Sequence, residues 1–229
     1  MHGKFFTDHY GYENAPRSYS CAVAQQSDYD DLVADNADWR RIDNDWLLSA
    51  DELALAMNSD TNNASLVLAF ELSPGGKVLL FAADAQRGNW LSWADNDFLD
   101  GDAKVSAKDL LGRAVLYKVG HHCSHNATLN GDFDSDYPCI GWMARGEYAE
   151  EFTAMITAVR SWAETQNGWD HPRKEIKDAL VSKCSGRVLQ TDTDLDTIPR
   201  PSGVTEDVWK AFRQRATGGS LYFDLTVPR

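Results

Sequence analysis

Residues 114–126 read AVLYKVGHHCSHN. The first six residues are largely apolar, as expected for a buried β-strand, and the apolar run stops abruptly at Gly120. Three histidines follow within five residues: His121, His122 and His125. A rigid strand fixes the position of the side chains at its end, and the loop beyond it leaves room for a substrate. The sequence therefore predicts that the side chains of a functional site follow directly after this strand.

A second pair of apolar runs lies upstream. Residues 65–72 (SLVLAFEL) and 77–82 (KVLLFA) are separated by a short loop that contains Pro74 and two glycines, which predicts a buried hairpin. The second run leads into Asp84, so a carboxylate also follows a strand end. Zinc, manganese and iron all accept a mixture of carboxylate oxygen and imidazole nitrogen. The alternative is that Asp84 caps a following helix and that the paired histidines bond only to loop backbone.

These stretches together resemble the later motifs of metallo-β-lactamase-fold hydrolases. The closest resemblance is to large bacterial members of that family, and a more distant one is to the hydrolase-like domain of competence-type DNA-uptake proteins. The resemblance covers most of the chain, from about Trp39 to about Asp194. The segments that carry it are 62–68, the strand ending at Asp84-Ala85, 116–128, 169–172 and 186–192.

The resemblance implies an α/β (α+β) layered sandwich, the C-terminal half of an αββα fold. It also implies that Asp84 bridges two metal ions, zinc or manganese, and that His121 or His122 is the last histidine ligand; His122 fits the motif slightly better. Asp84 and His122 would then be the catalytic residues, working with a metal-activated water on a phosphodiester or ester-like substrate. The residues expected to orient the ligands or face the substrate are Asn63, Ser65, Cys123, Ser124, His125 and Asn126.

Three departures from the family pattern stand out. The first motif, H-x-H-x-D-H, is absent, because no two of the six histidines have the H-x-H spacing. Ala83 and Cys123 occupy positions where the family usually has glycine. Ala83 would be strained if its backbone needs a positive φ, whereas the thiol of Cys123 could alter the loop or join the metal shell. We therefore expect a fragment or subunit that is inactive alone, binds metal weakly or not at all by itself, and needs an N-terminal half-domain or a homodimer partner.

A second hypothesis stays open: a non-catalytic, degenerate half-domain that serves as a protein-interaction module. Under either hypothesis, half of a sandwich exposes an apolar sheet face. The expected organisation is an irregular lead-in over 1–45 followed by the half-domain over 46–229. Besides the elements above, we expect helices at 49–57, 87–94, 148–164, 173–183 and 206–215, and strands at 139–144, 187–191 and 220–227.

Composition narrows the remaining function classes. The formal charge of −13 (22 Lys and Arg against 35 Asp and Glu) makes nucleic acid an unlikely partner. No apolar run approaches the roughly 18 residues that span a bilayer, and the N-terminus lacks the features of a secretory signal, so we expect a cytoplasmic protein that does not cross a membrane. The four cysteines are widely spaced and predict reduced thiols. His171 carries no motif and is expected at the solvated surface.

Overall fold

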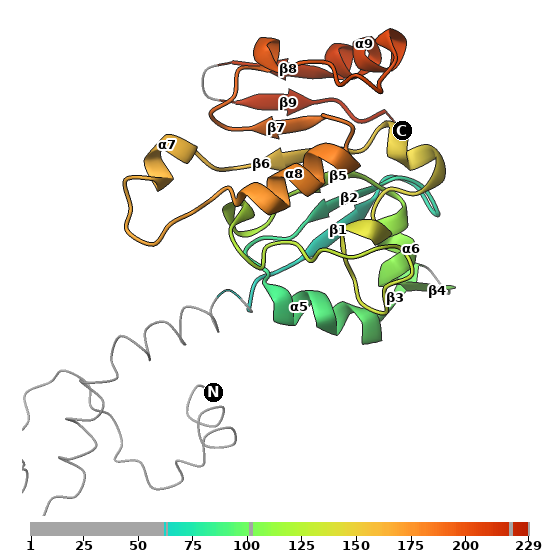
Figure 1. The fold of residues 1–229 in the computed structure, drawn as a ribbon. Helices are drawn as coiled ribbons and strands as arrows, with labels where there is room; N and C mark the ends of the chain where they lie inside the picture. The colour runs from blue at the N-terminus through green and yellow to red at the C-terminus, as the bar shows by residue number, and fades with distance from the viewer. Residues whose placement is uncertain (1–61, 63, 101–102, 220–221, 229) are drawn as a thin grey trace, which may run out of the picture. The chain divides into compact units, whose positions relative to one another are not determined.

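The computed structural model describes residues 62, 64–100, 103–219 and 222–228, which form an α/β structure with one mixed sheet and helices (Figure 1). The expectations for 1–45 and for a helix at 49–57 fall outside the described residues. No helix in the described part of the chain is long and apolar enough to cross a membrane. The strands are β1 (Leu68–Glu71), β2 (Val78–Phe81), β3 (Asp97–Asp100), β4 (Ala103–Ser106), β5 (Ala114–Lys118), β6 (Thr153–Ile156), β7 (Val188–Gln190), β8 (Ala216–Gly218) and β9 (Phe223–Leu225).

The helices are short, and several are single 3₁₀ turns. The α-helices are α5 (Arg87–Ser92), α6 (Ala107–Gly112), α7 (Arg160–Ala163), α8 (Lys174–Lys183) and α9 (Glu206–Arg215). The 3₁₀ turns are η1 (Trp93–Asp95), η2 (His121–Cys123), η3 (Ile140–Trp142), η4 (Gly146–Glu150) and η5 (Leu195–Thr197).

The main sheet has five strands in the order β1-β2-β5-β6-β7. β1 and β2 form the predicted antiparallel hairpin, whereas β2, β5, β6 and β7 run parallel to one another. Neighbouring parallel strands end at the same edge of a sheet. The loops that follow β2 and β5, which hold Asp84 and the histidines, are therefore adjacent, and this topology positions the candidate site.

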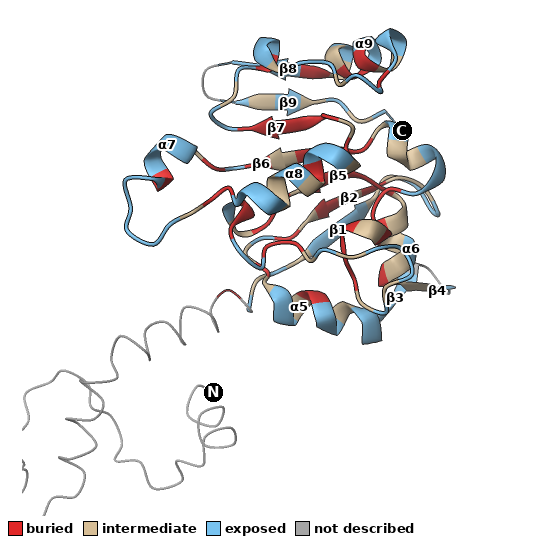
Figure 2. Cartoon of the chain, viewed as in Figure 1, coloured by how far each residue is buried: buried red, intermediate tan, exposed pale blue. Residues whose placement is uncertain are grey.

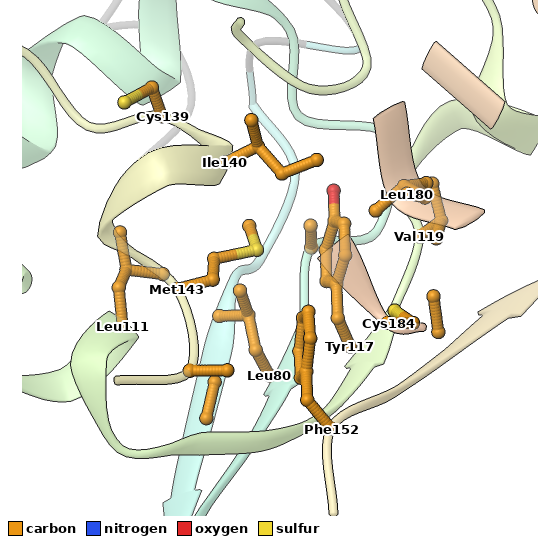
Figure 3. Close-up of a cluster of buried hydrophobic side chains, with 14 of the residues drawn as sticks. Leu80, Leu111, Tyr117, Val119, Cys139, Ile140, Met143, Phe152, Leu180 and Cys184 are labelled. Carbon is orange, nitrogen blue, oxygen red and sulfur yellow. The ribbon is translucent and has the colours of Figure 1, made fainter. Parts of the chain in front are cut away.

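One face of the sheet carries the main hydrophobic core. Side chains from alternate strand positions, such as Leu80 in β2 and Tyr117 in β5, pack there with Trp90 of α5, Leu111 of α6 and Leu180 of α8. Figure 3 shows this cluster, in which side chains from strands, helices and connecting loops meet. Tyr117 is fully buried, and its hydroxyl group lies 2.9 Å from Thr128 Oγ1.

The opposite face is covered unevenly. Leu189 of β7 and Met155 of β6 pack there against a second cluster that includes Trp209 and Phe212 of α9. Burial then declines along the sheet toward β1, whose residues are exposed or only half-buried (Figure 2). Leu68 is 39% exposed and Phe70 50%.

Most of the predicted elements are confirmed. The hairpin, the helix expected at 87–94 and the strands at 114–119 and 187–191 are present, as are the helices at 173–183 and 206–215. The strand expected over 220–227 is present as β9, which pairs with β8.

Two predictions are wrong. The expected helix over 148–164 contains β6, a strand whose neighbours on both sides are parallel strands, and a helix begins only at Arg160. The apolar positions in this stretch matched helical spacing because β6 is short and largely buried, with Thr153 as its only polar residue, so its sequence shows no alternation. The expected strand over 139–144 is instead the 3₁₀ turn η3, where Gly141 lies against the backbone of Asp132, which a Cβ would approach to 2.5 Å.

Candidate functional site

The loops after β2 and β5 are joined by a backbone hydrogen bond. The amide of His121 donates to the carbonyl oxygen of Ala83 at 2.8 Å. Gly120 permits this approach, because a Cβ at that position would lie 2.8 Å from the same oxygen. Asp84 and the histidine loop are thus held side by side, as the sequence predicted for two neighbouring strand ends.

Besides Asn126, a residue type that tolerates it, four non-glycine residues of these two loops have left-handed backbone conformations. Their φ angles are 46° at Ala83, 44° at His121, 54° at His122 and 61° at Cys123. A side chain makes such a conformation unfavourable by roughly 1–2 kcal/mol per residue. Two of the four, Ala83 and Cys123, are the positions where the resembled family usually has glycine, and the strain expected at Ala83 is present in the structure. Strained backbone of this kind concentrates at functional sites.

His121 is half-buried, and both of its ring nitrogens have polar neighbours. Ser124 Oγ lies 2.9 Å from Nδ1, the side-chain amide nitrogen of Gln86 lies 3.4 Å from the same atom, and Asn62 Nδ2 lies 3.3 Å from Nε2. Burial lowers the pKa of His121, whereas the charge of Asp84 raises it. The imidazole is therefore favoured in its neutral form, and a cation could bind Nε2 only if Asn62 moved away.

His122 is exposed and held differently. Its Nδ1 lies 2.8 Å from the carbonyl oxygen of Thr157, which can only accept a hydrogen bond, so Nδ1 carries the proton. This leaves the lone pair on Nε2, the arrangement in which metal-ligating histidines are commonly oriented by backbone carbonyls.

His171 was missed by the sequence reasoning. It was expected at the surface but is buried, and its ring centroid lies 5.3 Å from that of His122. Burial lowers the pKa of His171, and the charge of His122 lowers it further. The resemblance includes the segment 169–172 but gave no role to His171, and the contact with His122 depends on how the segment before α8 returns to the ends of the parallel strands.

Asp84 is half-buried, and its backbone amide donates to Ser65 Oγ at 3.2 Å. The loop before β1 therefore contacts the backbone of Asp84, and the role of Ser65 in orienting a ligand stays a prediction. Lys118, the last residue of β5, lies within electrostatic reach: burial lowers the pKa of its ammonium group, and Asp84 raises it. Lys118 Nζ also donates to Thr157 Oγ1 at 2.9 Å.

The other predicted site residues are divided between the interior and the surface. Cys123 is buried, and burial raises the pKa of its thiol to about 12, so the thiol stays protonated and faces away from solvent. His125 is exposed, with its ring centroid 6.4 Å from that of His121. Asn126 is exposed with a φ of 66°. Asn63 lies outside the described residues.

The donor types at these strand ends fit zinc or manganese, but their number does not suffice for a metal centre. Within the described residues, no group of three or more His, Cys, Asp and Glu side chains could hold a metal ion. A structural or catalytic zinc site needs at least three protein ligands. Asp84 and the histidines could thus supply only part of such a centre.

The chain was also compared with known proteins. No family model, no curated protein and no solved structure matches it.

Proposed function

We propose that this chain is the C-terminal part of a metal-dependent hydrolase of the metallo-β-lactamase fold, acting on a phosphodiester or ester-like bond, and that a second protein segment must complete its site. The main support is the juxtaposition of Asp84 with the histidine loop, held by the 2.8 Å bond between His121 and Ala83. The strained backbone at four neighbouring positions adds to it, because such strain persists only where the surrounding structure enforces it.

Three residues of this chain have distinct roles in the proposal. His122, with its proton on Nδ1, would direct Nε2 toward a zinc or manganese ion, and Asp84 would offer a carboxylate oxygen to the same centre. His121, bonded to Ser124, would position the loop rather than bind the ion. The remaining ligands would come from the second segment, since the described residues offer too few.

Metal content measured on the full chain tests the proposal. The chain is purified alone and together with the segment encoded directly upstream, then loaded with zinc or manganese, dialysed and submitted to elemental analysis. The upstream coding sequence is read for an in-frame H-x-H-x-D-H segment. Hydrolysis of bis-para-nitrophenyl phosphate and para-nitrophenyl acetate is followed in parallel.

We expect the combined protein to retain metal and to hydrolyse at least one of the two substrates. Asp84→Asn and His122→Gln should each lose both properties, whereas His9→Gln, at a histidine that carries no motif, should keep them. A combined protein without bound metal, or one whose metal content is unchanged by both Asp84→Asn and His122→Gln, would overturn the proposal.

A non-catalytic interaction module is the second candidate, and the uncovered sheet face favours it. Leu68 and Phe70 of β1 share one face with Leu79 and Phe81 of β2, and none of the four is buried. Apolar surface of this kind often marks a site of protein association. A complex with the upstream segment that forms in the presence of a metal chelator and hydrolyses neither substrate would support this candidate over the first.

A further inference from the structure

β1 is the last strand of the main sheet on its side, so within the described residues no strand pairs with its outer edge. The amide of Leu72 donates to the carbonyl oxygen of Lys77 at 2.9 Å, which makes these two residues a hydrogen-bonded pair of the antiparallel ladder. Such pairs alternate with non-bonded ones along a ladder. Ala69, opposite Leu80, is three residues from Leu72 and is therefore in a non-bonded pair. Its N–H and C=O consequently point outward, away from β2.

An apolar groove of about 450 Å³ runs beside this edge. Val67 and Ala69 of the β1 segment form one side of it, and Leu110 of α6 and Phe98 and Leu99 of β3 contribute to its other walls. Leu99 is 76% exposed and adds apolar surface to this wall. The groove and the edge of β1 together form one surface, the β1 groove.

The chemistry of the β1 groove specifies its occupant. A strand edge is satisfied by another extended backbone, and alternate side chains of that backbone would enter the groove. A helix satisfies its own backbone groups and would gain nothing from the edge. The occupant is therefore an extended segment with apolar residues at alternate positions.

The acidic residues near the β1 groove also indicate the charge of the segment that binds there. The hairpin segment 95–106, which contains β3 and β4, has four aspartates and one lysine in its sequence. Asp95 and Asp97 are exposed next to the groove residue Phe98, and the single lysine of the segment, Lys104, pairs with Asp97, so the segment keeps a net negative charge. A second copy of this chain would bring the same acidic segment and a further net charge of −13, so like charges would oppose pairing. A segment flanked by lysine or arginine would be attracted.

We propose that the β1 groove binds an extended strand from a partner protein, with apolar side chains at alternate positions and basic residues at its ends. The strand adds to β1 through the backbone of Ala69. This surface includes neither Asp84 nor any histidine, so the strand-binding proposal can be tested independently of the metal site proposed above.

The test uses a fluorescent synthetic peptide, Lys-Lys-Val-Thr-Ile-Thr-Val-Thr-Lys-Lys, and the full chain, with binding followed by fluorescence anisotropy. A matched peptide carries glutamate in place of every lysine. Ala69→Pro removes the outward N–H while leaving the bonds between β1 and β2 intact, and proline is tolerated on an edge strand. Phe70→Thr changes a side chain on the opposite face of β1, outside the groove, keeps every backbone N–H and is the matched control. Circular dichroism checks that both variants fold.

The basic peptide should bind the unaltered chain and Phe70→Thr, and the acidic peptide should bind at least several-fold more weakly. Ala69→Pro should weaken binding roughly tenfold, the factor expected from losing one hydrogen bond of average strength. If Ala69→Pro does not fold, Leu99→Asn removes an apolar wall at an exposed position and should also weaken binding several-fold. Equal binding of both peptides, no binding, or binding unaffected by the variant that folds would overturn the proposal. Self-association of the chain at this edge in sedimentation, abolished by Ala69→Pro, would overturn it too.

Discussion

The amide of His121 and the carbonyl oxygen of Ala83 are joined by a 2.8 Å hydrogen bond, and both residues have left-handed backbone conformations. The bond links the ends of two neighbouring parallel strands. Each loop therefore constrains the conformation of the other, and the strain on both sides is sustained by the same contact.

Replacing Ala83 by glycine should stabilise the protein. Glycine adopts a φ of 46° without the steric penalty of a Cβ, and this gain exceeds the entropy that glycine loses on folding. We expect the free energy of unfolding in urea to rise by about 0.5–1 kcal/mol.

The neighbouring Ala82→Gly is the matched control for Ala83→Gly. Ala82 is buried and does not have a positive φ, so glycine there removes a packed methyl group and adds unfolded-state entropy. That variant should lower the free energy of unfolding by about 1 kcal/mol. A destabilising Ala83→Gly would show that the backbone at this position is not strained.

Gly120 should not tolerate a side chain. In Gly120→Ala the new Cβ would lie 2.8 Å from the carbonyl oxygen of Ala83 and 3.2 Å from the Cβ of Ala82, so the two loops would have to separate. We expect a loss of about 1–3 kcal/mol in the free energy of unfolding, measured by urea denaturation. Gly203→Ala, where a Cβ would meet nothing within 4 Å, should change it little. Similar values for the two variants would contradict the close approach of the loops.

The buried guanidinium of Arg187 should be important for stability. It is 1% exposed and donates to the carbonyl oxygens of Phe152 at 3.0 Å and Ala149 at 2.7 Å. Arg187→Met keeps much of the volume but leaves these acceptors without their donor, so thermal or urea unfolding should show a loss of about 2–4 kcal/mol. Arg173→Met, at an exposed arginine paired with Asp170, should cost less than about 1 kcal/mol. An equal cost for both would refute the structural role of Arg187.

The start of α6 should give stability a dependence on acid pH. Ser106 N and Oγ both donate to Asp109 Oδ2, at 3.1 and 2.7 Å, and these bonds lower the pKa of Asp109 below its ordinary value of 3.8. The folded state thus favours the carboxylate, so its contribution is present above pH 3.8 and is lost as the pH falls through the folded-state pKa.

Asp109→Asn and Ser106→Ala test this pH dependence. Ser106→Ala should cost about 1 kcal/mol near neutral pH because it removes the N-cap side chain. Asp109→Asn should destabilise at pH 6 but have a smaller effect below the folded-state pKa, where the unaltered protein has lost the same charge. Urea unfolding at pH 6 and at a pH below the folded-state pKa of Asp109 gives the free energy of unfolding of each variant. A destabilisation by Asp109→Asn that becomes larger at the lower pH would contradict the predicted direction.

Much of this fold could be predicted from local sequence patterns. Strand β5 is an apolar run that stops at a glycine, and α8 and α9 show clear helical patterns, so these elements follow from their own residues. The strand β6 does not, because Phe152, Met155 and Ile156 fit a helix as well as a strand whose two faces are both covered. Its position between β5 and β7 decides that this segment is a strand, and that position is a property of the whole sheet.

In the candidate site, too, some features follow from local sequence and others depend on long-range packing. Asp84 and the histidine loop are adjacent because they follow neighbouring parallel strands, which the apolar runs predicted. The burial of His171 and the bond between His122 and Thr157 depend on long-range packing of segments more than 30 residues apart, which no local pattern encodes. The strain at Ala83 was predicted only through the resemblance and that at Cys123 was not predicted, since neither residue type by itself indicates a left-handed backbone.

The three described cysteines, at positions 123, 139 and 184, are free and buried, and burial raises the pKa of Cys123 and of Cys184 to about 12. Alkylating reagents attack thiolates that they can reach, so at neutral pH they would find none of these sulfurs in the closed molecule. Each modification event would instead record a transient opening of the interior. The rate at which these three cysteines are alkylated therefore measures how often the core opens, and no probe has to be introduced.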